Sequence, residues 1–255
     1  MLTVLTLNLR FGLADDGPNN WQNRKKGFPA FFDTYPTDFI GFQEANDFQI
    51  DFLADLLEDY HYIGKRSPSP SFWQNNIIFY QKSWTCAYHE HFFLSPTPSV
   101  PSRYHKSLWP RQCTMGMFKT NQRQVICINT HLDFETSVQV KSARLILNRL
   151  AHLPDDTPVI LMGDFNAAPF SACYNIFTDK NEEPAVPAPC FKDAFSEPFA
   201  GTHHGFTGHA HGDHIDWILF RGNIAVKRSQ IIQDKFNNIY ISDHFPLFAE
   251  FSWKD

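Results

Sequence analysis

Short apolar runs, rich in β-branched and aromatic residues and bordered by turn-forming residues, recur along almost the whole chain. Runs of this length and composition are typical of β-strands. The predicted strands are Leu2–Leu9, Asp38–Phe42, Asn76–Gln81, Gln112–Lys119, Gln124–Asn129, Pro158–Met162, Asp216–Phe220, Ala225–Ile232 and Pro246–Phe251. The pattern therefore predicts a protein built mainly from short strands.

Apolar residues at helical spacing are confined to a few segments. The segment Asn46–Tyr60 repeats leucine and isoleucine at this spacing, and its first residue can cap a helix. A second predicted helix is Thr136–His152, and a third, Trp21–Tyr35, is weakened by Gly27 and Pro29. Many strands with few interspersed helices favour a layered α/β sandwich over an alternating βα barrel. No internal repeat or linker divides the chain, so we expect one domain over residues 1–255.

Several of the predicted strands abut a short cluster of asparagine, aspartate, glutamate or histidine. The clusters are Asn8-Leu9-Arg10, Gln43-Glu44, Asn129-Thr130-His131-Leu132-Asp133, Gly163-Asp164-Phe165-Asn166, His214-Ile215-Asp216 and Ser242-Asp243-His244. The last two precede their strands, whereas the others follow theirs. Antiparallel strands need this reversal to place their polar ends at the same edge as the rest, so we expect one shared site.

The residue types in these clusters fit one chemistry. Carboxylate and amide oxygens are hard ligands that suit Mg²⁺ or Mn²⁺ better than Zn²⁺, and a bound divalent cation can neutralise phosphoryl charge. The oxygen donors are Glu44, Asp164, Asp216, Asp243, Asn8 and Asn166. Two histidines, His131 and His244, titrate near neutrality and suit proton transfer or charge stabilisation. No cysteine or G-x-S-x-G serine elbow competes as a nucleophile.

Composition narrows the choice of substrate. Hydrophobic residues make up 43% of the 255 residues, with 26 phenylalanines, which is typical of a globular protein with a large core. The formal net charge is −5, so the chain lacks the excess of basic residues that gives non-specific affinity for nucleic acid. A long duplex substrate is therefore disfavoured, while single strands remain open.

The cysteines and the N-terminus bear on location. The five cysteines are scattered without C-x-x-C spacing, which is typical of reduced thiols in a reducing compartment. The first strand has no basic segment before it, and no uncharged apolar run approaches the ~20 residues that a membrane-spanning helix needs. We therefore expect a soluble, cytoplasmic protein with no membrane span.

Taken in order, the polar clusters resemble the motifs of the endonuclease/exonuclease/phosphatase superfamily. The resemblance extends from residue 2 to residue 251, and Trp21-Gln22-Asn23-Arg24 resembles a signature of a branch of small bacterial metal-dependent hydrolases. It implies the DNase-I-like fold, a four-layer α/β sandwich with two packed, mostly antiparallel sheets flanked by helices. That branch has no well-defined substrate to carry over.

The resemblance also implies a role for each matching residue. Glu44 would be the principal metal ligand, helped by Asn8 and Asp243. Asp164 would orient and deprotonate the attacking water, and Asn166 would contact a phosphoryl oxygen.

The two histidines divide the remaining work. His131 would contact the substrate and protonate the leaving oxygen, and His244, oriented by Asp216, would stabilise the charge that develops on the phosphoryl group. The position where relatives often carry a carboxylate that buttresses the catalytic histidine holds Gln74 here. A neutral partner raises the pKa of a histidine less than a carboxylate does, so the strength of His131 as an acid is in question.

Residues outside the motifs add candidates for substrate binding. Arg111 can bind a phosphate in bidentate fashion, and Arg103 is a weaker candidate. The histidine-rich segment from His203 to His214 matches no standard zinc spacing. We expect it to form a surface loop that overhangs the site.

The sequence therefore predicts a phosphoric ester hydrolase that uses Mg²⁺ or Mn²⁺ and an in-line attack of water, with a small phosphate ester as substrate. A nuclease on the same fold is the alternative, and a non-catalytic binding module is a third hypothesis. The choice between phosphodiester and phosphomonoester, the number of metal ions and the oligomeric state stay open at this stage.

Overall fold

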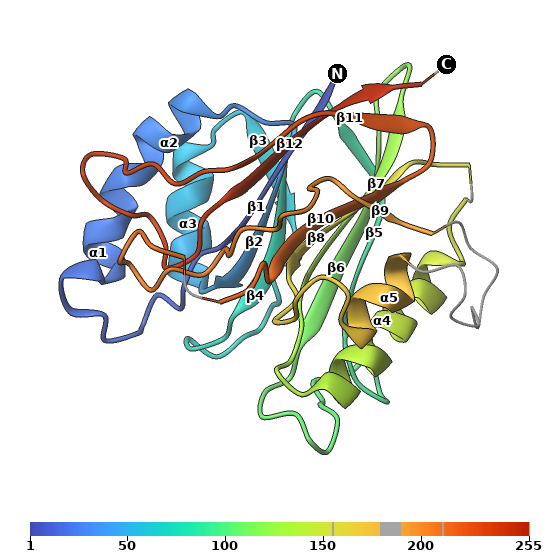
Figure 1. The fold of residues 1–255 in the computed structure, drawn as a ribbon, viewed down its shortest axis with the longest axis horizontal. Helices are drawn as coiled ribbons and strands as arrows, with labels where there is room; N and C mark the ends of the chain where they lie inside the picture. Colours follow the sequence, from blue (N-terminus) through green and yellow to red (C-terminus); the bar gives the residue numbers. More distant parts are fainter. Residues whose placement is uncertain (155, 179–189, 211, 255) are drawn as a thin grey trace.

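The computed structural model describes residues 1–154, 156–178, 190–210 and 212–254. Two mixed sheets of six strands each form its centre (Figure 1). The first sheet has the order β11 (Ile224–Ile231), β12 (Leu247–Trp253), β1 (Leu2–Asn8), β2 (Phe39–Ala45), β4 (Asn75–Gln81) and β3 (Tyr60–Ile63). The second has the order β5 (Thr85–Phe93), β6 (Gln112–Lys119), β7 (Gln124–His131), β8 (Val159–Asp164), β10 (Asp216–Arg221) and β9 (Lys192–Asp193).

Helices cover both outer faces of the paired sheets (Figure 1). The first sheet is covered by α1 (Trp21–Arg24), α2 (Phe28–Thr34) and α3 (Asp47–Leu56), and the second by α4 (Thr136–Leu150) and α5 (Ala172–Thr178). The four-layer DNase-I-like sandwich is therefore confirmed. Only the β1–β2 and β7–β8 pairs are parallel among the strand pairs of the described residues, so the sheets are mostly antiparallel, as predicted.

The predicted helices are shorter than their patterns indicated. The segment expected to be helical over Trp21–Tyr35 is interrupted by a 3₁₀ turn at Lys25–Gly27, and α2 then begins with a proline in its first turn. The segment expected to be helical from Asn46 ends at Leu56, because Tyr60 starts the edge strand β3.

Three apolar layers hold the sandwich together. Between the sheets, side chains such as Phe39 and Ile78 from the first pack against Val125 and Ile160 from the second. Separate clusters lie beneath α1–α3 and beneath α4–α5. Because both faces of each sheet are covered, central strands such as β1 are buried along nearly their full length, which explains why they are almost continuously apolar in sequence.

The strand register brings the polar clusters to one edge. In the first sheet Asn8 lies opposite Gln43 on the parallel strand β2, and in the second His131 lies opposite Asp164 on the parallel strand β8. Asp216, the first residue of β10, lies opposite Asp164 from an antiparallel strand. The predicted reversal of the C-terminal motifs is therefore confirmed. Within the described residues, no helix has the length and apolar character needed to cross a membrane.

Candidate active site

Asp164 stands at the centre of the polar edge. Its Oδ2 accepts a hydrogen bond from Asn8 Nδ2 at 2.9 Å, and lies 3.4 Å from His131 Nε2 and 3.9 Å from His244 Nε2. Asn8 Nδ2 also lies 3.3 Å from Glu44 Oε1. Strands from both sheets thus deliver these side chains to one place, as the sequence predicted.

The backbone explains the residue type at two positions of the Gly-Asp-x-Asn motif, Gly163 and Asn166. A Cβ atom on Gly163 would lie 2.0 Å from the carbonyl oxygen of Thr130, so only glycine lets β8 approach β7 this closely. Asn166 has a φ of 48°, which asparagine tolerates well, and its backbone nitrogen donates to Asp164 Oδ1 at 2.9 Å. This turn directs Asn166 Nδ2 to within 3.0 Å of His131 Nε2.

Glu44 lies at an irregularity in β2, where the register with β4 shifts between Phe42 and Ala45. Its φ of 59° is unusual for glutamate, a kind of backbone strain that occurs often at functional sites. Its Oε2 accepts a hydrogen bond from the backbone nitrogen of Phe11 at 2.6 Å. Its Oε1 lies 4.0 Å from His131 Nδ1, so this carboxylate faces the same space as Asp164.

His244 forms a buried ion pair. Its Nδ1 lies 2.8 Å from Asp216 Oδ2. Burial alone would lower the pKa of His244, but the charges of Asp216, Asp164 and Asp243 outweigh it and raise the pKa to about 10. The backbone nitrogen of Asp216 donates to Thr202 Oγ1 at 3.2 Å, which holds the start of β10 in place. His244 is therefore a cation at neutral pH, as its predicted role requires.

His203 joins the site from the histidine-rich segment, which the sequence predicted to form a surface loop that overhangs it. It pairs in backbone register with His244, the two rings lie 4.9 Å apart, and His203 Nε2 lies 3.8 Å from Asp243 Oδ2. Arg10 Nε lies 3.6 Å from the same oxygen. Burial acts to raise the pKa of Asp243, but His203, His244 and Arg10 together lower it to about 2.

The other histidines of this segment have different environments. His204 stacks on Phe245 with ring centroids 4.0 Å apart, and the buried His214 lies 2.9 Å from the carbonyl oxygen of Ala200. His209 is exposed, and His211 lies outside the described residues. The segment therefore packs against the catalytic edge through several of its members rather than lying free above it.

His131 is held as a neutral imidazole. Burial, with the positive charges of Arg111 and His244, lowers its pKa well below the ordinary value. Asn166 Nδ2 donates one hydrogen to Leu132 O at 3.0 Å, which identifies this atom as the amide nitrogen. Its second hydrogen faces His131 Nε2, which must then act as an acceptor. Gln74 does not buttress this ring: its carbonyl oxygen accepts from Gln112, and no hydrogen bond among the described residues joins its side chain to His131.

Arg111 has a buried guanidinium with unused hydrogen-bonding capacity. The residue is only 8% exposed, its Nε has no hydrogen-bond partner, and it lies 3.9 Å from Asp133 Oδ2. Burial lowers the pKa of Arg111, against the charges of Asp164, Asp133 and Glu44, which act to raise it. Because buried charged donors rarely lack a hydrogen-bond partner, this nitrogen is suited to an anionic ligand. Arg103, by contrast, donates to the carbonyl oxygen of Ser107.

Arg24 is a structural residue whose part in the site the sequence indicated only through the Trp-x-x-Arg pattern. Its fully buried guanidinium donates to Leu9 O at 2.7 Å and to Ile241 O at 2.9 Å, and Nε donates to Asn19 O at 2.7 Å. These bonds fasten the loop after Asn8 to the segment that precedes Asp243. Arginine suits this place because its planar guanidinium carries donors on three separate nitrogens, whereas lysine offers a single nitrogen.

The donor chemistry of the site fits a divalent metal ion. The carboxylates of Asp164 and Asp216 lie close together, and burial together with the charge of Asp216 raises the pKa of Asp164. A divalent cation would relieve this repulsion. Side-chain atoms of Asp164, Asp216 and His244 lie within 4.8 Å of one another, as do those of His203, Asp243 and His244; while His244 is protonated, the carboxylates are the ligands that each group offers. Glu44, predicted to be the main ligand, lies beside the first group through Asn8.

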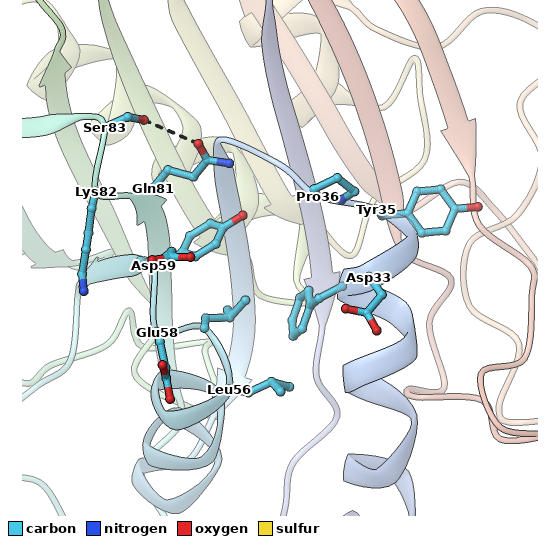
Figure 2. Close-up of a pocket in the computed structure, with 12 residues that line it drawn as sticks. Asp33, Tyr35, Pro36, Leu56, Glu58, Asp59, Gln81, Lys82 and Ser83 are labelled. Atoms are coloured by element: carbon cyan, nitrogen blue, oxygen red, sulfur yellow. Dashed lines mark hydrogen bonds between the residues drawn. The ribbon is translucent and has the colours of Figure 1, made fainter.

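A separate cavity of about 700 Å³ lies near the opposite end of β2, between the C-terminal ends of α2 and α3 (Figure 2). Its carboxylates come from α2 (Asp33) and from the turn after α3 (Glu58 and Asp59), and they are spread around the opening rather than turned toward one another. None of the residues of the polar edge lines this cavity. Converging charged groups, not volume, therefore place the candidate active site at the polar edge.

Comparisons with known proteins agree with this geometry. Residues 5–244 match the sequence model of the Endonuclease/Exonuclease/phosphatase family. A search of curated protein sequences returned no match.

Solved structures with the same fold span the whole chain. An endonuclease/exonuclease/phosphatase family protein from Bacteroides thetaiotaomicron has a TM-score of 0.87 at 26% identity, covering 100% of this chain and 98% of that one. A mannosyl-6-phosphatase from the same organism has a TM-score of 0.87 at 25% identity, covering 99% and 100%. D. rerio TDP2, complexed with a single-strand DNA product, has a TM-score of 0.76 at 16% identity, covering 98% of both chains, and shows likeness of fold alone.

Proposed function

This chain belongs to the endonuclease/exonuclease/phosphatase family, and we propose that it hydrolyses a small phosphate ester with Mg²⁺ or Mn²⁺. The observation that carries the proposal is the convergence on Asp164 of Asn8, His131 and His244. The similarity to a phosphatase that acts on a sugar phosphate supports a small ester. The net charge of −5 weighs against a nuclease that binds long duplexes.

The acidic residues provide the base and the ligands. Asp164 orients a water and accepts its proton, a role favoured by a pKa that burial and Asp216 raise toward neutrality. Glu44, with Asn8 and Asp243, would hold the metal ion. When bound, the ion neutralises phosphoryl charge and aligns the attacking water.

The cationic and amide groups act on the phosphoryl oxygens. His244 carries a positive charge fixed by Asp216, and it stabilises the negative charge that grows on these oxygens during attack. The turn at Asn166 places its side-chain amide against His131 Nε2, and the hydrogen that faces His131 becomes available to a phosphoryl oxygen once that nitrogen is protonated. Arg111 contributes its Nε, which has no hydrogen-bond partner in this structure, as an anchor for the phosphate.

His131 completes the set on the side of the leaving group. Its imidazole is neutral in the free protein. A phosphate that binds beside it adds negative charge, which raises the pKa and allows the ring to take up and then donate a proton. This coupling replaces the buttressing carboxylate that the chain lacks at Gln74.

The proposal is tested by hydrolysis of bis(p-nitrophenyl) phosphate in Mg²⁺ or Mn²⁺. Asp164→Asn should lower kcat on the order of 100- to 10,000-fold, the usual contribution of a general base. The matched control is Asp193→Asn, since Asp193 is also a buried carboxylate with a pKa raised by burial, but lies on β9 and bonds Tyr174. The control should keep a rate near that of the wild type. Equal rates for the two variants would refute the assignment of Asp164.

A further inference from the structure

A loop that combines basic and aromatic residues borders the candidate active site at Arg111. Residues 103–111, here called the basic–aromatic loop, read Arg-Tyr-His-Lys-Ser-Leu-Trp-Pro-Arg and contain no acidic residue. This local composition contrasts with the net charge of −5 for the whole chain. Arginine and lysine interleaved with aromatic residues are typical of surfaces that bind nucleotides.

The loop is fastened to the segment that carries His131. Ser107 Oγ lies 2.5 Å from Asp133 Oδ2, two residues beyond the histidine, and 2.7 Å from the carbonyl oxygen of Trp109. Lys106 Nζ lies 3.3 Å from Glu135 Oε1, and this carboxylate partly neutralises the lysine charge. These contacts fix the loop relative to the leaving-group side of the site, so a ligand bound there meets a surface that is already ordered.

The loop exposes large apolar side chains at this border. Leu108 is 72% exposed and Trp109 64%, while Phe134, which follows Asp133, is 68% exposed. The guanidinium carbon of Arg111 lies 5.5 Å from the centre of the Phe134 ring, so the exposed aromatic residues and the buried phosphate anchor adjoin. Grouped exposed apolar residues beside a polar site mark a ligand-binding surface, because leaving them in water has a cost that a ligand removes.

We propose that the basic–aromatic loop is a nucleotide-binding subsite, in which Trp109 stacks on the base of a nucleotide whose phosphate is held by Arg111. The exposed Arg103 and, in part, Lys106 supply positive charge that complements this anionic ligand. An indole face pairs with any base, because each base offers a π-face. The inference rests on the proposed function, in which Arg111 anchors the phosphate in the candidate active site. It narrows the substrate from small phosphate esters to nucleotides.

The test compares two ligands that differ only in the base. Adenosine 5′-monophosphate and ribose 5-phosphate are titrated calorimetrically into Asp164→Asn protein in Mg²⁺ buffer, so that binding is read without turnover. The protein should bind the nucleotide roughly 10- to 100-fold more tightly, the effect of one base–aromatic stack. Adding Trp109→Ala should remove this preference without weakening ribose 5-phosphate, and adding Trp109→Phe should retain most of it.

The control replaces another exposed aromatic residue. Tyr88 is 41% exposed on β5 and pairs with Met117, farther along the strands from Arg111, so Tyr88→Ala should keep the preference. Equal affinities for the two ligands, no detectable nucleotide binding, or an unchanged preference in Trp109→Ala would each overturn the subsite. Because turnover is not measured, such a failure would leave the proposed phosphoesterase activity standing.

Discussion

The backbone at Glu44 differs from the predicted local structure, whereas its side chain lies beside the other motif residues, as the sequence predicted. The sequence places it after an apolar strand, and the structure extends β2 through it to Ala45 by way of an irregular register. Its φ of 59° costs energy that a glycine would avoid, on the order of 1–3 kcal/mol. The carboxylate gains an orientation toward Asn8 and His131 in return.

The His244–Asp216 pair gives a prediction about pH and stability. The pKa of His244 is raised to about 10 in the folded protein from an ordinary value of 6.5. A raised pKa means that the pair contributes its full stabilisation below pH 6.5 and loses it as the pH rises through 10. The variant His244→Asn removes the titrating group and leaves Asp216 buried, which should lower the free energy of unfolding by about 3 kcal/mol near pH 6.5.

Urea unfolding of both proteins in chelator, at several pH values between 6.5 and 10, measures this difference. The gap between wild type and variant should narrow as the pH rises. A gap that stays constant over this range would show that His244 carries no proton-linked stabilisation.

At the scale of elements, a buried polar bridge joins the two sheets directly beneath the site. Asn129 on β7 accepts from Gln43 Nε2 at 2.6 Å, and its Nδ2 donates to Phe42 O and to Ile77 O at 2.8 Å each. The sequence assigned Asn129 to a polar cluster without a role. The bridge explains why this part of the motif is an amide: it satisfies carbonyl groups left free where β2 loses its regular pairing.

Removing the bridge should destabilise the fold. Asn129→Ala leaves the buried partners of three hydrogen bonds unpaired, so we expect the free energy of unfolding to fall by about 3 kcal/mol. Asn148→Ala on the exposed face of α4 is the control and should change it by less than about 0.5 kcal/mol. Chemical unfolding monitored by circular dichroism measures both. Similar values for the two variants would show that the sheets do not depend on the bridge.

The central strands and the two longer helices could be predicted from the sequence because their burial imposes a pattern. Strands β3 and β5 and helix α5 could not. Strand β5 is largely exposed and reads Thr-Cys-Ala-Tyr-His-Glu-His before its apolar end, so no alternation marks it. Strand β3 has four residues and α5 only seven, both too short for a periodic signal. Their pairing is set by tertiary contacts with β6, β4 and α4.

At the scale of the whole molecule, the site lies along the seam between the two sheets. Asn8, Glu44 and His244 come from the first sheet or its connections, and His131, Asp164 and Asp216 from the second. The motifs predicted this convergence because strand direction fixes where each polar end lies. The contribution of His203 could not be predicted, since a loop's position depends on contacts such as the Phe245 N to Thr202 O bond that no local pattern encodes.

The dependence of hydrolysis on Mg²⁺ concentration tests the central claim, that these separate segments form one metal-dependent phosphoesterase centre. Wild-type protein should lose its activity on bis(p-nitrophenyl) phosphate in EDTA and regain it with a saturable response to Mg²⁺. Glu44→Gln should raise the half-saturating Mg²⁺ concentration on the order of tenfold or more, as expected for loss of a charged ligand. Glu90→Gln, which alters a carboxylate on β5 that pairs with Arg149 of α4, should leave this concentration unchanged. Full activity in EDTA, or the same Mg²⁺ response in Glu44→Gln as in the wild type, would contradict the account.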